Sequence, residues 1–298
     1  MKVIVSGSSG LIGRSLVSSL SDGGHEVVRL VRREPQSADE VRWDPAIGTI
    51  DAAGLEGADV AFHLAGAGIG DKRWTKSYKK EILDSRVLGT GLLASTLAAL
   101  DSKPSVMVSG SAIAWYGDRG DEILDESAPQ GDGFLADVVA AWEAAAQPAA
   151  DAGIRVVHPR TGIVLSSTSL VIGRLLLPFK LGAGGRMGSG DQWWSWIALD
   201  DVVRAMTNLA FLSELAGPVN LTAPNPVTNR EFVDTFGSVL RRPTVIPTPS
   251  LAIKSILGSE LAEALVFQSQ RVVPARLIED GFEFELTNLR EALQSAVA

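Results

Sequence analysis

Three glycines at intervals of three residues follow the first apolar segment of the chain. Residues 2–6, KVIVS, have the β-branched composition of a buried strand, and residues 7–13, GSSGLIG, follow them directly. Glycines let the backbone turn tightly and approach a pyrophosphate, while the next helix offers free N–H groups and the positive end of its dipole. A glycine-rich turn without a ligand is the alternative, but the position at the start of a strand–helix unit favours a dinucleotide-binding loop. We expect this loop to comprise Gly7, Ser9, Gly10, Leu11, Ile12 and Gly13.

Strand-like and helical segments alternate through the first half of the chain. Short β-branched runs lie at residues 25–33, 58–66, 105–117 and 154–165, and segments with helical spacing separate them. Repeated strand–helix–strand units predict an α/β fold, a Rossmann doubly wound parallel sheet with helices on both faces. Beyond residue 166 the rhythm changes, because glycine, tryptophan and then proline become frequent. We therefore expect a Rossmann domain at residues 1–165 and a smaller mixed lobe on the substrate side at residues 166–298.

Composition narrows the range of partners. The 298 residues carry a net charge of −8, which disfavours nucleic acid and anionic membranes as partners. Cysteine is absent, so disulfides and thiolate chemistry are excluded, and no pair of the three histidines has the spacing of metal ligands. The apolar run at residues 170–182 contains Arg174, Pro178 and Lys180, which argue against a membrane span. The N-terminal apolar run is too short for a signal peptide, and we expect a cytoplasmic protein.

The end of the second predicted strand indicates which dinucleotide binds. A carboxylate about 20 residues past the glycine loop would accept the ribose 2′-hydroxyl of NAD. Arg32 and Arg33 stand at that place, and guanidinium groups suit a 2′-phosphate through charge-assisted hydrogen bonds. Glu34 follows them, and we expect it to point away. The sequence therefore favours NADP over NAD, with a pair of solvated surface arginines as the alternative.

Motifs along nearly the whole chain carry a family resemblance. The segments GSSGLIG, DVAFHLAGAG, SRVLGTGLL, VSGSAIAWYG, VHPRTGIVL and SWIALDDVVRAM occur in the order typical of extended short-chain dehydrogenase/reductases. With GIGDKRWTKSYKKEILDSR, GDGFLADVVAAWE and the tail QSQRVVPARLIEDGFEF, the chain resembles the epimerase-like subgroup with a DUF1731 C-terminus, the YfcH-like or SDR39U family. The resemblance implies a Rossmann domain that binds NADP(H), and a small C-terminal lobe. It places Leu64, Ala65, Gly66 and Arg160 at the cofactor, with Ser109 and Ser111 near the nicotinamide. Hydrogen bonding at the strand end is the alternative role of the two serines.

The proton-transfer pair that is usual in this superfamily is absent. A tyrosine with a pKa near 10 needs a lysine one helical turn away to work near neutral pH. The two tyrosines, Tyr78 and Tyr116, are followed four residues later by Ile82 and Gly120, so the motif Tyr-x-x-x-Lys occurs nowhere. The helix that should hold the pair offers Phe134 or Leu135 in place of the tyrosine, and Val138 or Val139 in place of the lysine.

Three hypotheses follow from this absence. The first is an NADP-dependent oxidoreductase that acts on a small carbonyl or sugar-like substrate, with Ser111 and Tyr116 as the proton donors because their loop should face the nicotinamide. Charge would come from Asp137 or Glu143, or from Lys72 and Arg73. The second is a sensor or regulator without catalysis, for example in cell division. The third is a nucleotide-sugar epimerase, which also needs a base.

The substrate side of the site is less defined. By analogy with related enzymes, Arg186 would receive an anionic substrate. Trp194, in the motif GSGDQWWSW, would form an aromatic wall over the substrate, or it would be a core residue that seals the two lobes. We expect an unidentified small-molecule substrate and allow for a homodimer.

Overall fold

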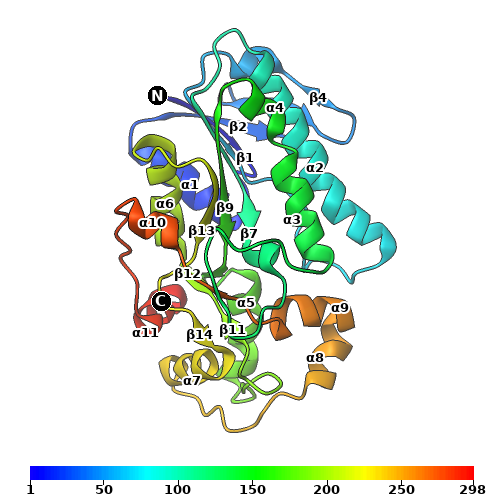
Figure 1. The fold of residues 1–298 in the computed structure, drawn as a ribbon, viewed down its shortest axis with the longest axis vertical. Helices are drawn as coiled ribbons and strands as arrows, with labels where there is room; N and C mark the ends of the chain where they lie inside the picture. Colours follow the sequence, from blue (N-terminus) through cyan, green and yellow to red (C-terminus); the bar gives the residue numbers. More distant parts are fainter.

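A nine-stranded, mostly parallel sheet forms the centre of the computed structural model, which describes residues 1–298 (Figure 1). Only the short β4 runs antiparallel to its neighbour β3. The strands of this sheet are β1 (Lys2–Ser6), β2 (Glu26–Val31), β3 (Glu40–Asp44), β4 (Thr49–Ile50), β5 (Val60–His63), β6 (Val106–Ser109), β7 (Ser111–Ala112), β9 (Arg155–Thr161) and β13 (Gly217–Leu221).

The strand order reverses beside β1. From one edge to the other the order is β13-β9-β6-β5-β1-β2-β3-β4, so the chain builds outward from β1 through β2 and then crosses to β5. Val3 of β1 lies opposite Val27 of β2 and Val60 of β5 in parallel register. This is the doubly wound order, and ligands of such sheets bind at the carboxyl ends of the strands where the order reverses. The predicted fold class is confirmed.

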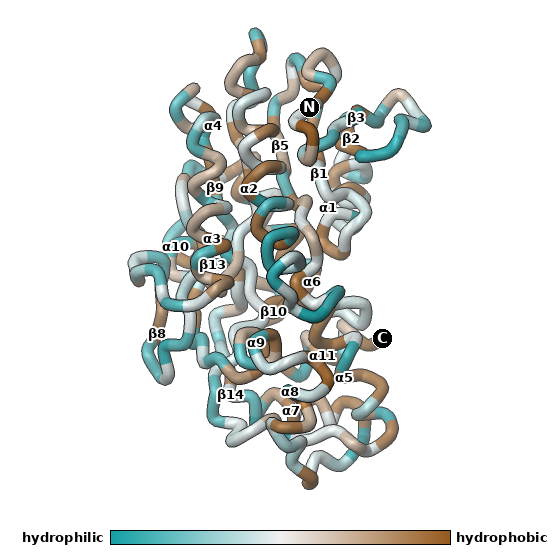
Figure 2. The backbone as a smooth tube through the Cα atoms, turned by 90° about the vertical axis from the view of Figure 1, so that its right-hand side faces the viewer, coloured by the Kyte–Doolittle hydropathy of each residue, from teal (hydrophilic) through white to brown (hydrophobic).

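Helices cover both faces of the sheet. Helices α1 (Leu11–Asp22) and α6 (Leu199–Phe211) lie on one face, and α2 (Lys76–Ala99), α3 (Phe134–Ala144) and α4 (Gln147–Asp151) lie on the other (Figure 1). Alternate residues of a strand point to opposite faces, so Val3 and Val5 pack against α1 and α6, while Ile4 packs against α2 and α4. Polar and apolar residues alternate along the helices in Figure 2, as expected for helices that turn one face to a core.

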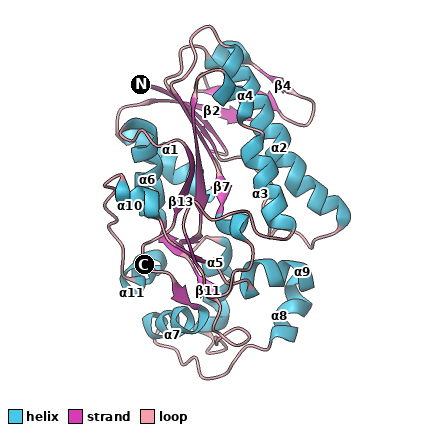
Figure 3. Ribbon diagram, viewed as in Figure 1, coloured by secondary structure: helices cyan, strands magenta, loops and turns pink.

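The C-terminal part of the chain adds a smaller lobe below the sheet (Figure 3). Its core contains Trp196, Phe179, Phe232 and Phe236. The elements are α5 (Leu170–Lys180), α7 (Asn229–Leu240), α8 (Ser250–Leu257), α9 (Ser259–Ala262) and α11 (Leu289–Val297), with the two-stranded sheets β10–β12 (Ile163–Leu165 and Trp196–Ala198) and β11–β14 (Trp193–Trp194 and Val227–Thr228).

The predicted domain boundary after residue 165 does not separate the large sheet from the smaller lobe. Strand β13 pairs with β9, and helix α6 packs under the same sheet, although both lie beyond that boundary. The chain thus leaves the sheet for β10 and α5, returns to it through α6 and β13, and leaves it again.

The last segment of the chain ties the lobe to the rim of the sheet. Strand β15 (Arg271–Val272) pairs with β8 (Ile123–Leu124), and α10 (Ala275–Glu279) follows it. The hydroxyl of Ser195 donates to the carbonyl oxygen of Gln270 at 2.7 Å and accepts from the amide of Val272 at 2.8 Å. None of the helices is both long and apolar enough to pass through a bilayer.

Candidate functional site

The glycine loop between β1 and α1 has the close packing that its sequence predicts. Gly7 has a φ of +70°, and a Cβ atom there would lie 2.6 Å from the carbonyl carbon of Leu64. A Cβ atom at Gly13 would collide with the carbonyl oxygen of Gly7. Side chains at these positions would therefore push apart the loop, the helix and the end of β5.

The N-terminus of α1 can hold an anion. Gly10 is the N-cap, no side chain caps the helix, and its first turn has no acidic residue. The first amides of a helix have no partner within the helix, so those of Leu11, Ile12 and Gly13 are available to a bound group. A pyrophosphate fits this arrangement of donors and glycines.

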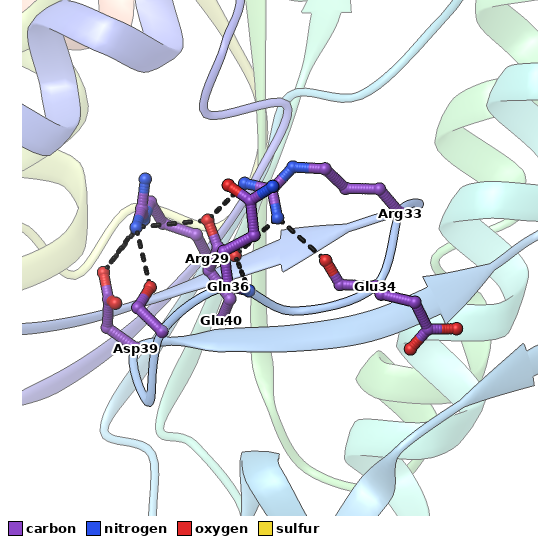
Figure 4. Close-up of polar contacts among 7 residues, drawn as sticks. Arg29, Arg33, Glu34, Gln36, Asp39 and Glu40 are labelled. Atoms are coloured by element: carbon purple, nitrogen blue, oxygen red, sulfur yellow. Dashed lines mark hydrogen bonds and ion pairs between the residues drawn. The ribbon is translucent and has the colours of Figure 1, made fainter.

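The two arginines at the end of β2 have different surroundings, and Figure 4 shows those of Arg33. Arg33 donates to both carboxylate oxygens of Glu40, at 2.7 and 2.6 Å, and the same carboxylate lies 3.2 Å from Arg29. Hydrogen bonding to Arg33 lowers the pKa of Glu40 to about 2. Arg32 is exposed and makes no ion pair or side-chain hydrogen bond within the protein. Arg32 is therefore the more available of the two guanidinium groups.

Glu34 lies as expected. Its carboxylate pairs with Arg42 on β3 and points away from Arg33, which contacts only the Glu34 backbone carbonyl. The carboxylate thus does not compete with a phosphate for Arg32 or Arg33 in this arrangement.

A cleft of about 450 Å³ opens at the carboxyl edge of the sheet, between the sheet and the C-terminal lobe. Apolar side chains and backbone form most of its walls. Of the predicted cofactor residues, Leu11, Leu64, Ala65 and Gly66 line it. The other walls include Ala67–Asp71, Arg86, Ala112–Ala114, Leu135, Trp142, Thr161–Val164, Ser169–Val171, Trp193–Ser195, Ala264, Leu265, Gln268 and Gln270.

Trp194 meets both descriptions given from the sequence. It lines the cleft, yet only 4% of its surface is exposed, and its ring packs 5.1 Å from that of Phe232. Its indole N–H donates to the carbonyl oxygen of Val266 at 3.3 Å. The tryptophan therefore belongs to the lobe's core while one part of it faces the cleft. Arg186 does not line the cleft, and it donates to the carbonyl oxygen of Ser189 at 3.1 Å.

Helix α3 presents an apolar side chain where a catalytic tyrosine is usual. Leu135 lines the cleft, whereas the ring of Phe134 packs against Trp74, with centroids 5.1 Å apart. Val138 and Val139 are both buried. The helix therefore brings no proton donor to the cleft from any of these four positions.

Tyr116 is enclosed in the protein and does not line the cleft, so the expectation that it faces the nicotinamide does not hold in this structure. A short 3-10 helix, Ile113–Tyr116, gives the cleft Ile113 and Ala114 but turns the tyrosine inward. The hydroxyl donates to Oδ1 of Asn220 at 2.7 Å and accepts from Arg160 at 3.2 Å. Burial raises the pKa of Tyr116, which makes its hydroxyl a weaker acid.

Glu143 forms hydrogen bonds with two of the other predicted polar residues, Ser111 and Arg160. Its carboxylate accepts from the Ser111 hydroxyl at 2.6 Å and from Nε and Nη2 of Arg160, both at 2.9 Å. Ser111, Ser109 and Arg160 are all buried outside the cleft lining, and the hydroxyl of Ser109 has no partner. The structure thus joins Ser111, Tyr116 and Arg160 in one buried network, and it separates this network from the cleft surface.

The polar groups that do line the cleft were not among the predicted site residues. Arg86 and Asp71 come from α2 and the loop before it, and Gln268 and Gln270 come from the tail. The glycines of the motif AGAG are the sequence feature that could have indicated this part of the cleft, because Arg86 and Asp71 pack on them. A Cβ atom at Gly66 would lie 3.3 Å from Cζ of Arg86, and one at Gly68 would collide with the carboxylate of Asp71.

Two family models match most of the chain. The NAD dependent epimerase/dehydratase family matches residues 3–216, and the domain of unknown function DUF1731 matches residues 248–296. The first match covers the large sheet except β13 and ends directly before that strand, and the second covers the tail that lines the cleft.

Known proteins resemble the chain over their full lengths. An epimerase family protein of Mycobacterium tuberculosis is 40% identical over 291 residues, which is 98% of this chain and 96% of the relative. Human epimerase family protein SDR39U1 is 35% identical over 301 residues, and the match covers both chains completely. The crystal structure of human SDR39U1 with NADPH superposes with a TM-score of 0.90 at 34% identity and covers 99% of each chain.

These matches agree with the order of strands, the glycine loop and the tail described above. The chain belongs to the NAD dependent epimerase/dehydratase family, in the group of epimerase family proteins with a DUF1731 segment that includes human SDR39U1.

Proposed function

We propose that this protein binds NADPH along the carboxyl edge of the sheet and is an oxidoreductase for a small carbonyl substrate. The observation that carries the proposal is the continuity of the cleft, which runs from Leu11 in the glycine loop to Gln268 in the tail. Such a cleft has room for the reactive end of a dinucleotide beside a small substrate. The human relative was crystallised with NADPH, which is the predicted cofactor.

The proposed roles of the protein groups follow from their positions. The free amides at the start of α1 hold the pyrophosphate, and Arg32 binds the 2′-phosphate. Leu64, Ala65 and Gly66 line the path of the cofactor. When bound, NADPH supplies the hydride, and the apolar walls around Leu135 exclude water from it. The proton must come from a polar group of the cleft or from solvent, because Tyr116 and Ser111 are engaged elsewhere.

Calorimetric titration with NADPH, NADP, NADH and NAD in parallel tests the cofactor part. We expect tight binding of only the phosphorylated pair, since Arg32 is the uncompensated group at the adenosine end. A panel of aldehydes and ketones, read as loss of NADPH absorbance, then tests the oxidoreductase part. No binding of any dinucleotide would rule out both parts.

A sensor or regulator is the second candidate. It is favoured by one observation, the apolar Leu135 and Val139 at the places of the usual acid–base pair. This function predicts tight NADPH binding without turnover of any carbonyl compound. It also predicts that NADP and NADPH differ in the conformation they stabilise, which hydrogen exchange of the tail would detect. An epimerase would need a base at the same place, so the same observation counts against it.

A further inference from the structure

Arg86 is the one cationic side chain that lines the cleft. It projects from α2 toward the loop after β5, where Gly66 leaves room for its guanidinium group. Its Nη1 atom donates to the carbonyl oxygens of Ala67 at 3.0 Å and Ile82 at 3.1 Å. The guanidinium carbon lies 5.0 Å from the ring centroid of Trp142, which also lines the cleft. One nitrogen and one face of the group are thus fixed by the protein.

The remaining donors of Arg86 have no partner in the protein. Nε and Nη2 make no hydrogen bond within the protein, and both atoms are accessible to solvent. No carboxylate lies within ion-pair distance of the group. Asp71 lines the same cleft, but its carboxylate lies over Gly68 and does not neutralise the arginine. Two donor nitrogens of a fixed cation, which carry three N–H groups, therefore remain available to a ligand.

The partial burial of Arg86 strengthens its attraction for an anion. Burial lowers the pKa of Arg86 to about 10, so the charge is only incompletely solvated, although it persists at neutral pH. An anion that replaced the missing solvation would bind more strongly here than at an exposed arginine. The planar fork of a guanidinium group matches a carboxylate with two parallel hydrogen bonds.

We infer that the substrate carries a carboxylate and that Arg86 binds this group in the cleft. The inference deepens the proposed function and rests on it, because it assigns the substrate class of the same site. The pyrophosphate of the cofactor is an anion too, but its donors lie at the start of α1, where the loop packs through Gly7 on Leu64, whereas Arg86 packs on Gly66. The substrate class is therefore a small carbonyl compound with an acid group and an otherwise apolar body, as the apolar walls require.

Acetate and acetamide test the inference without knowledge of the substrate. The two probes have nearly the same shape and differ in charge, and both are small enough for any cleft of this size. The NADP-loaded protein is titrated with each probe at constant ionic strength, with tryptophan fluorescence and thermal stability as readouts. Trp142 reports directly because it lies against Arg86. We expect a saturable response to acetate and at least a tenfold weaker response to acetamide.

Variants link the response to Arg86. Arg86→Gln should lose the preference for acetate, and Arg86→Lys should keep part of it because the charge remains. Arg290→Gln on α11 removes the same charge at a residue outside the cleft lining and should respond like the wild-type protein. Melting temperature and NADPH affinity are measured for every variant. If Arg86→Gln does not fold, the acetate–acetamide comparison on the wild-type protein still decides.

Two results would overturn the inference. One is an equal response of the wild-type protein to acetate and acetamide. The other is a large loss of NADPH affinity in Arg86→Gln with no acetate preference in the wild-type protein, which would assign the arginine to the pyrophosphate. Either result leaves the proposed NADPH-dependent function intact, whereas failure to bind NADPH at all would remove that function and not the anion site.

Discussion

Glu40 determines which of the two arginines at the end of β2 is available to a phosphate, because it pairs with Arg33 and not with Arg32. Its carboxylate accepts from both nitrogens of Arg33 and lies beside Arg29, so it compensates Arg33 and holds it in place. Arg32 keeps its charge uncompensated. The sequence places both arginines correctly at the predicted strand end. It does not distinguish them, because the partner of Arg33 stands seven residues later on another strand.

Replacing Arg32 should therefore affect the phosphorylated cofactors alone. Charge-assisted hydrogen bonds contribute about 1.5–3 kcal/mol, so Arg32→Ala should weaken NADPH binding roughly 10- to 150-fold. NADH binding should not change. Arg42→Ala is the matched control, since Arg42 is also exposed and lies on the neighbouring strand. Calorimetry that gives the same NADPH affinity for Arg32→Ala and the wild-type protein would contradict this assignment.

His63 should make the stability of the protein sensitive to acid. It is completely buried at the end of β5, its Nδ1 lies 2.7 Å from the Ser6 hydroxyl, and its Nε2 has no partner. Burial lowers its pKa to about 4, compared with about 6.5 in an unfolded chain. Between these values the unfolded chain binds more protons, so stability falls as the pH drops from 6.5 to 4.

The free energy of unfolding should lose about 3 kcal/mol across this range through His63, since each pKa unit corresponds to about 1.4 kcal/mol. Denaturant unfolding at pH 7 and pH 4.5 measures the loss. His63→Gln keeps a hydrogen-bonding side chain without the titration. The pH dependence of this variant should therefore be shallower, and equal slopes for both proteins would refute the prediction.

At the scale of elements, a buried ion pair connects the helix layer to the sheet. Glu143 on α3 holds Ser111 of β7 and Arg160 of β9, and Tyr116 extends the network to Asn220 of β13. The helical spacing of α3 and the apolar runs of β1, β2, β5, β6 and β9 could be predicted from the sequence. Strand β3 could not, because EVRWD mixes charged and apolar residues, and its Glu40 is buried only through contacts with distant arginines.

Glu143→Gln should destabilise the fold by roughly 3–5 kcal/mol, because it leaves the Arg160 charge buried without its partner. Tyr116→Phe should cost roughly 1–3 kcal/mol, since Oδ1 of Asn220 loses its donor. Neither change touches the cleft lining, so Tyr116→Phe should retain NADPH affinity within about twofold. A severalfold loss of turnover in a stably folded Tyr116→Phe protein would instead support the catalytic role expected from the sequence.

At the scale of the whole molecule, the site is formed by segments that are far apart in the chain. The glycine loop, the Rossmann order of strands and the family could be read from local motifs. The convergence of Arg86, Trp194 and Gln268 on one cleft could not, because it depends on how the tail packs against the rim of the sheet. Residue patterns report which face of an element is apolar, but not which distant loop will cover it.

This interleaving predicts that the large sheet and the lobe unfold together. Helix α6 and strand β13 return to the sheet between segments of the lobe, and β15 pairs with β8 across the two. Calorimetry should therefore show a single thermal transition. NADPH at 100 times its Kd should add about 2.7 kcal/mol of stability and shift this transition as a whole. Two transitions, of which NADPH moves only one, would show that the parts melt independently.

The pairing of β15 with β8 also fixes when the cleft is completed during translation. The glycine loop and strands β1 to β9 are made first, while Gln268, Gln270 and Val272 leave the ribosome more than a hundred residues after β9 begins. A nascent chain that already contains the whole nucleotide loop still lacks one wall of the cleft. Enclosure of the cleft thus follows synthesis of the glycine loop, and a chain truncated before residue 268 would have an open cleft.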